Sequence, residues 1–203
     1  MFHLAKPTPG EIERQIGIAS SQDQLKAEFI ALQNGLKAQL PRRFAHDRSR
    51  VQLGAGRSAF ESAARGFEKW KQFDLGWVRV ANPTAEIKVG NIIAVEVHSL
   101  GLWSLNLSQI VEVIREPFSI GFTYKTTLQH VEEGEERFLL TLDPDSGAVW
   151  YELEAVSKPH SSLARLGFPA TRMFQHKFAR DSQRRMRELS GPQTNENRPG
   201  QRS

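Results

Sequence analysis

The strongest candidate for chemistry is a group of hydroxyl, imidazole and carboxylate side chains in one short stretch of the chain. Its members are Tyr124, Thr126, His130, Glu132 and Glu135. A histidine with nearby carboxylates can act as a general base or bind a metal ion. The alternative is a hairpin whose glutamates are solvated and whose histidine caps a turn. Because no second histidine stands at metal-ligand spacing, the sequence argues against a metal site.

The strand that carries two of these residues also carries a row of aromatic side chains. Alternation along the strand places five residues on one face: Phe118, Ile120, Phe122, Tyr124 and Thr126. An aromatic face with polar tips is typical of a core or of the wall of a ligand pocket. Phe122, Tyr124 and Thr126 are therefore candidate ligand-binding residues, together with His130 in the loop beyond them.

Four more candidates lie in other predicted strands and turns: Trp77, His98, Trp103 and Trp150. Aromatic side chains dominate the burial in protein cores, so core packing is the alternative for the tryptophans. Trp103 differs because the Leu100–Trp103 turn would expose apolar surface, which is typical of a cavity rim or an interface. His98 could fix the orientation of a bound molecule.

The composition predicts a soluble, cytoplasmic globular protein. The chain has 203 residues, of which 39% are hydrophobic and 25% charged, with a formal net charge of +4. It has no cysteine, which excludes disulfides, thiolate nucleophiles and cysteine-ligated metals. No run reaches the roughly 18 apolar residues of a membrane span, and the N-terminus does not read as a secretory signal.

Helix signals occupy the N-terminal part of the chain. Thr8–Glu11 is a capping box with proline at the first helical position, and a second box at Ser21–Gln24 precedes a helical pattern that stops at Pro41. A short strand is predicted at Arg50–Gly54. A third capping box, Ser58–Glu61, predicts a helix that ends near Phe73.

A run of strands follows this helix. The predicted strands are Trp77–Ala81, Asn91–His98, Leu105–Glu116, Phe118–Thr127, Glu135–Leu142 and Ala148–Ser157. In the third of these, Leu105, Leu107, Val111 and Val113 are expected on one face. Asp143–Gly147 is a hairpin turn. Short connections between consecutive strands favour an antiparallel meander.

A long basic helix follows the strands. Ser161 or Ser162 can cap it, a bend is expected near Gly167 and Pro169, and it runs to about Leu189. Its predicted inward stripe is Leu166, Ala170, Met173, Phe174 and Phe178. The element order predicts an α+β fold of the helix-grip type, as in START and Bet v 1 proteins. In that fold a curved antiparallel sheet of about six to seven strands grips the C-terminal helix, here with extra N-terminal helices.

Several strings of residues resemble a bacterial and plant family catalogued as domain of unknown function nineteen-ninety. The resemblance covers roughly residues 47 to 189. It rests on Val51–Gly56, Phe60–Ala63, Trp70–Val78, Gly121–Tyr124, His130, Glu132, Gly134–Phe138, Val149–Glu152, Ser157–Pro159 and Leu163–Pro169. At two positions where the family usually has glycine, this chain has Lys125 and Gln129. The resemblance implies a domain type and no activity.

The sequence therefore predicts an N-terminal helical annex at 1–46, a helix-grip domain at 47–189 and a disordered tail at 190–203. The leading hypothesis is binding of a hydrophobic or amphipathic small molecule between the sheet and the C-terminal helix. A second is an enzyme on this scaffold that uses His130 with a carboxylate. A third is peripheral binding of an anionic membrane or nucleic acid by the basic helix, although no base-stacking platform favours nucleic acid. We expect no cofactor and no metal.

Overall fold

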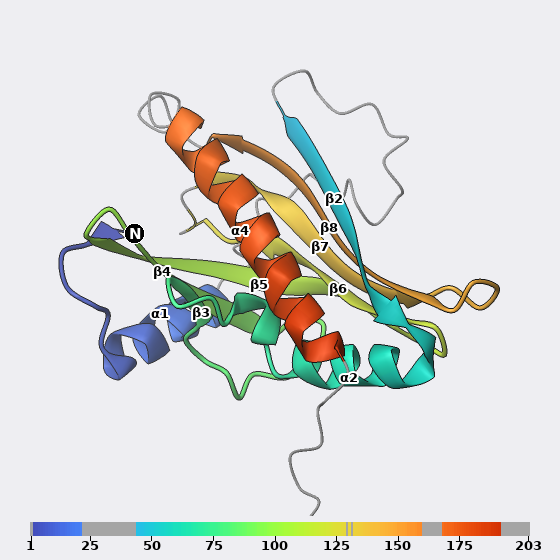
Figure 1. Cartoon of the computed structure of the whole chain (residues 1–203). Coiled ribbons are helices and arrows are strands. Elements are labelled where there is room, and N and C mark those ends of the chain that lie inside the picture. Colours follow the sequence, from blue (N-terminus) through green and yellow to red (C-terminus); the bar gives the residue numbers. More distant parts are fainter. Residues whose placement is uncertain (1, 22–43, 129, 131, 160–167, 192–203) are drawn as a thin grey trace, which may run out of the picture.

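One antiparallel sheet of eight strands forms the centre of the molecule. The computed structural model describes residues 2–21, 44–128, 130, 132–159 and 168–191 (Figure 1). The sheet order is β2-β8-β7-β6-β5-β4-β3, and β1 pairs with β5 beside this path. The strand bounds are β1 Phe2–His3, β2 Ala45–Ala55, β3 Val78–Val80, β4 Ile92–Ser99, β5 Leu102–Glu116, β6 Ser119–Thr126, β7 Glu132–Leu142 and β8 Ala148–Pro159.

Alternation of side chains gives this sheet two different faces. In β4, Ile93 and Val95 belong to the main core cluster, whereas Ile92 and Ala94 belong to a smaller cluster on the other face.

The predicted hairpin between β7 and β8 is confirmed. In this turn the Asp143 carboxylate accepts hydrogen bonds from the backbone N–H groups of Asp145 and Ser146. The turn ends at Gly147, which has a φ of 68°.

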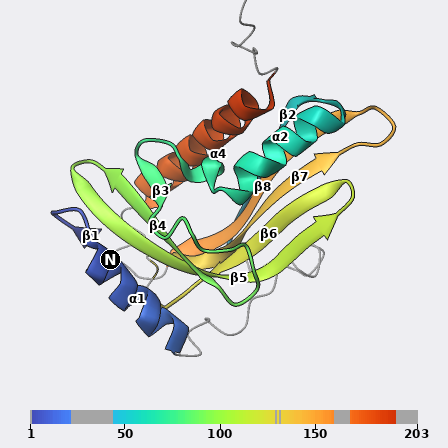
Figure 2. The ribbon, with the colours of Figure 1, turned by 90° about the horizontal axis from the view of Figure 1, so that it is seen from below.

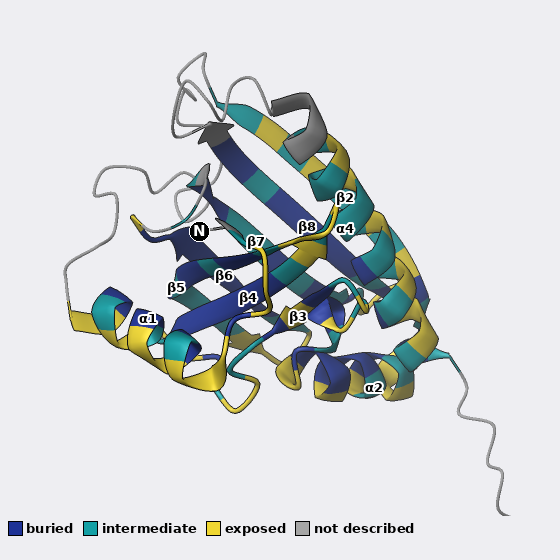
Figure 3. Ribbon diagram, turned by 90° about the vertical axis from the view of Figure 1, so that its left-hand side faces the viewer, coloured by how far each residue is buried: buried dark blue, intermediate teal, exposed yellow. Residues whose placement is uncertain are grey.

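Helices cover both faces of the curved sheet. The helices are α1 Pro9–Ser21, α2 Gly56–Glu68, the short 3-10 helix η1 Lys71–Phe73 and α4 Phe168–Ser190. Figure 2 shows α2 and α4 inside the curve of the sheet and α1 against its convex side. The outward sides of α1 and α2 are exposed, while the strands beneath them are largely buried (Figure 3). Within the described ranges no helix has the length and apolar character needed to cross a bilayer.

The predicted start of α1 is confirmed, but the predicted start of α2 is wrong. The hydroxyl of Thr8 accepts a hydrogen bond from the backbone N–H of Glu11 at 3.3 Å. In contrast, α2 begins at Gly56 after Ala55, without a side-chain cap, so the Ser58 box is not used as predicted. Gly56 has a φ of 84° and its N–H bonds to the carbonyl of Gly147, which turns the chain into the helix early.

A β-bulge in β5 overturns the expectation that its apolar residues share one face. The register with β6 shifts between Ile110 and Glu112. Before the shift, Leu105 and Leu107 face α1 on the convex side, and after it Val113 packs against the main core. An extra residue in one strand reverses which face every later residue occupies.

The inward stripe of α4 also differs from the predicted one. Phe178 packs against the main core as predicted, but Met173 is 56% exposed. Met186 and Leu189, which the predicted stripe did not include, also pack against this core. The predicted caps of this helix and Gly167 of its predicted bend lie outside the described residues, whereas Pro169 lies in the first turn of α4. The second N-terminal helix and all but the first two residues of the predicted tail also lie outside the described residues. The order of strand, helix, six strands and long helix nevertheless confirms the predicted helix-grip, Bet v 1-like architecture.

Candidate functional site

Aromatic rings fill the part of the concave face that lies next to α2. Phe122 on β6 and Phe138 on β7 stack with ring centroids 5.0 Å apart. Phe67 and Trp70 each approach Phe122 to 5.4 Å, and Phe73 lies 5.2 Å from Phe138. Aromatic pairs at such separations are in direct contact. This half of the interior is therefore a packed core.

Farther along β5 and β6, the concave face changes from large rings to small polar groups. Cross-strand pairing places Asn106 opposite Val95 and Ser108 opposite Ile93, so both side chains share the face of the core. Thr126 pairs with Ser108 and is 5% exposed, while Ser108 is 2% exposed. We call the following residues the concave polar patch: Asn106, Ser108, Tyr124, Thr126 and Glu136.

Hydrogen bonds join part of this patch. The Tyr124 hydroxyl donates to the Glu136 carboxylate, which lies directly opposite it on β7. The Thr126 hydroxyl accepts the backbone N–H of Gly134 at 3.0 Å. The Asn106 amide nitrogen donates to the Ser104 hydroxyl at 3.2 Å, but its oxygen is buried and meets no partner among the described residues. An unsatisfied buried acceptor costs about 1–3 kcal/mol, so it favours a donor in its vicinity.

Charged and aromatic side chains fasten α4 beside this patch. The Trp77 indole N–H donates to the Asp181 carboxylate at 2.9 Å, and the Lys177 ammonium lies 4.0 Å from the Trp77 ring centroid. Lys177 also donates to Asp181 at 2.5 Å. Burial opposes ionisation of Asp181, but these hydrogen bonds and the nearby cations outweigh it and hold its pKa below the ordinary value. Phe174 lies 6.1 Å from Trp77.

The structure does not bring the predicted site residues together. Phe122, Tyr124, Thr126 and Trp77 belong to the concave side, and Phe122 lies within the packed aromatic core. On the convex side, His98 stacks on Trp103 with centroids 4.4 Å apart, and Arg50 lies 4.2 Å from the Trp150 ring centroid.

The predicted group around His130 is likewise divided between two faces. His130 is half-buried in the β6–β7 connection, and its backbone N–H bonds to the carbonyl of Thr127. Glu135 pairs with Lys125 on the convex face, opposite to the face of Tyr124. Lys125, which stands where the family usually has glycine, is 4% exposed. Burial lowers its pKa, against the opposing charges of Glu135 and Glu133. Gln129 and the side chain of Glu132 lie outside the described part of the structure.

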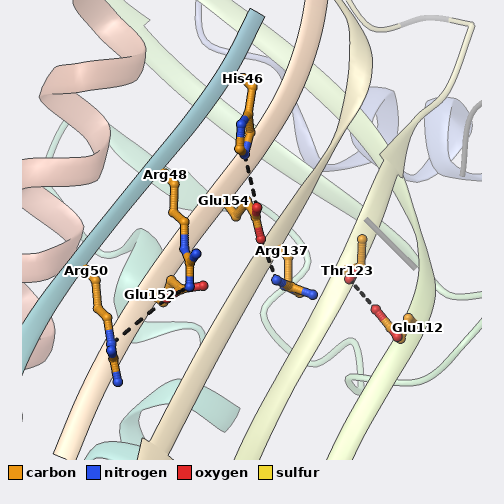
Figure 4. Close-up of polar contacts among 8 residues, drawn as sticks. All are labelled: His46, Arg48, Arg50, Glu112, Thr123, Arg137, Glu152 and Glu154. Atoms are coloured by element: carbon orange, nitrogen blue, oxygen red, sulfur yellow. Dashed lines mark hydrogen bonds and ion pairs between the residues drawn. The ribbon is translucent and has the colours of Figure 1, made fainter. Parts of the chain in front are cut away.

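A ladder of ion pairs that was not predicted from the sequence crosses the convex face (Figure 4). Glu154 on β8 is 2% exposed and receives hydrogen bonds from Arg137 and, at 3.0 Å, from His46. Next to it, Arg48 donates to Glu152 at 2.8 Å. On β6, the Thr123 hydroxyl donates to Glu112 at 2.6 Å. The sequence signal for this ladder was ionisable side chains at every second position of two strands. They are His46, Arg48 and Arg50 on β2, and Glu152 and Glu154 on β8.

This ladder fits a structural role better than a catalytic one. Each buried carboxylate in it is satisfied by a cation or a hydroxyl, which is how proteins accommodate buried charge. Over the described part of the chain, no group of three or more His, Asp or Glu side chains has a metal-binding arrangement. The concave polar patch, in which the buried amide oxygen of Asn106 meets no partner among the described residues, is the better candidate for binding. Two members of the patch, Asn106 and Glu136, were not among the predicted site residues.

Comparison with known proteins relates this geometry to a family. The family described as "Domain of unknown function (DUF1990)" matches residues 30–185. A UPF0548 protein of Dictyostelium discoideum is 31% identical over 212 residues, covering 96% of this chain and 98% of that protein. Another UPF0548 protein, from Arabidopsis thaliana, is 32% identical over 145 residues, covering 68% and 70%. A hypothetical protein from Helicobacter pylori shares the fold at TM-score 0.53 and 11% identity, over 73% of this chain and 88% of that one.

Proposed function

The chain belongs to the family described as "Domain of unknown function (DUF1990)", and we propose that it binds an amphipathic small molecule between the sheet and α4. The observation that carries this proposal is the change along the concave face from packed aromatic rings to small, buried polar groups. A solid core would continue with large apolar side chains, because these contribute most of the burial energy. Small side chains and an unsatisfied acceptor favour space for a ligand.

The surroundings of the patch provide both kinds of contact that such a ligand needs. Val95 and Val97 on β4, with Trp77 and Phe174 at the α4 side, offer apolar surface. The polar end of the ligand would meet the concave polar patch. We place the packed rings of Phe122 and Phe138 at the inner end of the site. Binding energy would come chiefly from apolar burial, with the polar groups fixing orientation.

Two other functions have less support. The enzyme hypothesis grouped His130 with Tyr124 and Glu135, but Glu135 lies on the face of the sheet opposite Tyr124. Binding of anionic surfaces by α4 would use cations that already contact acids, as Arg172 contacts Asp47 and Lys177 contacts Asp181. These positions and contacts therefore support neither the enzyme hypothesis nor the anionic-surface hypothesis.

Native mass spectrometry of gently purified protein tests the proposal, with Ser108→Leu as the variant that fills the site. We expect wild-type protein to carry an adduct of lipid-like mass, and Ser108→Leu to lose it while retaining its melting temperature. The control is Ser119→Leu at the start of β6, on the other side of the sheet from the patch, which should keep the adduct.

A clean mass for the wild-type protein after exposure to a lipid extract would contradict the proposal. So would a loss of about 1–3 kcal/mol of stability in Ser108→Leu, because that is the cost of overpacking a filled core. Both results together would identify the polar patch as part of an ordinary interior.

A further inference from the structure

We infer that the tip of the β4–β5 hairpin docks on a lipid bilayer and inserts its leucine side chains into the membrane surface. We call Leu4, Leu100 and Leu102 the leucine tip. The inference goes beyond the ligand proposed above and does not depend on it, because it concerns the outer end of a hairpin and not the interior of the sheet. Either proposal can therefore fail without the other.

The leucine tip is exposed apolar surface at one end of the molecule. Leu100 is 82% exposed and Leu4 is 88% exposed, and Leu102 is exposed as well. The residue before Leu4 is His3, which pairs with Trp103, so Leu4 lies beside the start of β5, where Leu102 stands. Figure 2 shows the hairpin and β1 together at the left-hand edge of the molecule. Apolar side chains gathered at an exposed end are typical of a surface that contacts an apolar partner.

The backbone of the hairpin turn does not favour a leucine. Leu100 has a φ of 52° and Gly101 a φ of 76°, and positive φ at both central residues is the pattern of a type I′ turn. Asparagine, aspartate and glycine suit the first of these positions, whereas a leucine at positive φ is uncommon. Asparagine would also be better solvated at so exposed a position. The needs of the folded chain therefore do not account for Leu100, whereas burial of its side chain in a partner would.

A collar of aromatic and basic side chains lies directly behind the leucines. The Trp103 ring stacks on His98 with centroids 4.4 Å apart, and the Lys6 ammonium lies 5.6 Å from the centroid of the same ring. The described stretches 2–6 and 97–105 contain no carboxylate side chain. Tryptophan favours the headgroup level of a bilayer, and a lysine there can place its ammonium among the lipid phosphates.

The order of these groups along the hairpin matches the layers of a bilayer surface. Ser99 pairs with Leu102 next to the turn, and His98 pairs with Trp103 one step farther back. The leucines would thus reach the hydrocarbon while the collar stays among the headgroups. A bilayer accepts projecting side chains without a shaped pocket, whereas a protein partner must provide one. Binding of this kind comes chiefly from apolar burial, so it should persist in salt, unlike attraction of the α4 cations to an anionic surface.

Vesicles of phosphatidylcholine test the inference, because they carry no net charge that would attract a basic helix. The full chain is mixed with these vesicles, and the bound fraction is measured by flotation at about 0.1 M and about 0.5 M salt. We expect the wild-type protein to bind at both salt concentrations. Leu100→Asn should bind at least about tenfold more weakly, because it loses a buried leucine. Since asparagine suits the turn, this variant should melt at no lower temperature than wild type.

Val89→Asn is the matched control. Val89 is another exposed apolar residue, but it precedes β4, at the end of that strand away from the hairpin. This variant should bind vesicles as the wild-type protein does. Vesicles with brominated acyl chains then locate the contact. They should quench the fluorescence of bound wild-type protein, and the quenching of bound protein should disappear in Trp103→Phe, because Trp103 is the tryptophan of the hairpin.

Failure of the wild-type protein to bind these vesicles would overturn the inference, and so would equal binding by Leu100→Asn. Binding that is lost at the higher salt concentration would overturn it as well and would assign the contact to charge. A wild-type dimer that Leu100→Asn converts to a monomer, without vesicle binding, would instead assign the leucine tip to contact between copies of this chain. The native mass of the purified protein decides the ligand proposal independently of all these outcomes.

Discussion

At the scale of single residues, Asp181 shows how one carboxylate can couple two elements. It accepts hydrogen bonds from Trp77, just before β3, and from Lys177, one turn earlier in α4. Its side chain is only 16% exposed, so these bonds are poorly screened by solvent. The contact therefore fixes α4 against the edge of the sheet, where the proposed ligand site lies.

The lowered pKa of Asp181 predicts a loss of stability in acid. Its folded-state pKa lies below the ordinary value of 3.8, so this contribution is present above that pH and disappears as pH falls through the folded-state pKa. We expect Asp181→Asn to cost about 1–2 kcal/mol at neutral pH and to lose less stability than wild type between about pH 5 and pH 3. Urea unfolding across this range measures both. Parallel pH curves for the two proteins would contradict the assignment.

A second residue-scale prediction concerns Glu154 in the convex ladder. Glu154→Gln leaves Arg137 and His46 facing a neutral amide in a nearly buried position. We expect a loss of about 3 kcal/mol or more, because breaking a buried pair leaves an uncompensated charge. The control is Glu68→Gln, whose partner Arg115 is half exposed, and which should change stability by at most about 0.5 kcal/mol. Chemical denaturation that gives equal losses would refute the distinction.

At the scale of elements, the orientation of α4 decides which of its residues stabilise the fold. Phe178 lies 5.4 Å from Phe73 and 6.2 Å from Phe138, whereas Met173 is 56% exposed. We expect Phe178→Ala to cost about 2–3 kcal/mol and Met173→Ala to stay within about 0.5 kcal/mol. Thermal and urea unfolding of both variants check this. A larger loss of stability for Met173→Ala than for Phe178→Ala would mean that α4 is rotated about its axis so that Met173 faces the core.

The β5 bulge is the element that places the polar patch beside the core. Ser108 and Ile110 lie on the concave face before the bulge. Because the register shifts at 110–112, Val113 lies on the same face after the bulge. Bulges commonly redirect side chains near functional sites. Without the shift, the alternation of β5 would turn Val113 away from the core.

At the scale of the whole molecule, net positive charge alone is a weak basis for binding anionic surfaces. Among the cations of α4, Arg172, Lys177, Arg184 and Arg185 each lie within 4.0 Å of an acidic group. The protein should therefore elute from heparin below about 0.15 M salt, where long-range attraction is already screened. Arg184→Ala on α4 and Lys88→Ala in an exposed loop should lower the eluting salt concentration equally. A much larger shift for Arg184→Ala would instead support the anionic-surface function.

Most of the fold could be predicted from the sequence, because its local signals agree with one another. Alternation, the Asp143–Gly147 turn and the Thr8 cap act over a few residues, and the structure confirms the turn, the cap and the alternation outside the bulged strand β5. The start of α2 was missed because a hydrogen bond to a distant hairpin, at Gly147, decides it. Only part of the candidate site was predicted. Tyr124 and Thr126 belong to the concave patch, whereas Trp103 and Trp150 lie on the convex face.

The sequence by itself determined the order of elements, the antiparallel meander and the residues able to form an aromatic core, since these follow from short-range periodicity and turn chemistry. Tertiary structure alone decided that Glu136 and not Glu135 shares the face of Tyr124, and that Asn106 and Ser108 join them. It also decided that, of the two residues Phe178 and Met173 that were both expected on the inward side of α4, only Phe178 faces the core. The reason is physical. Cross-strand register and helix rotation are set by packing between segments far apart in the chain, and a shift of one residue in register exchanges the two faces of a strand.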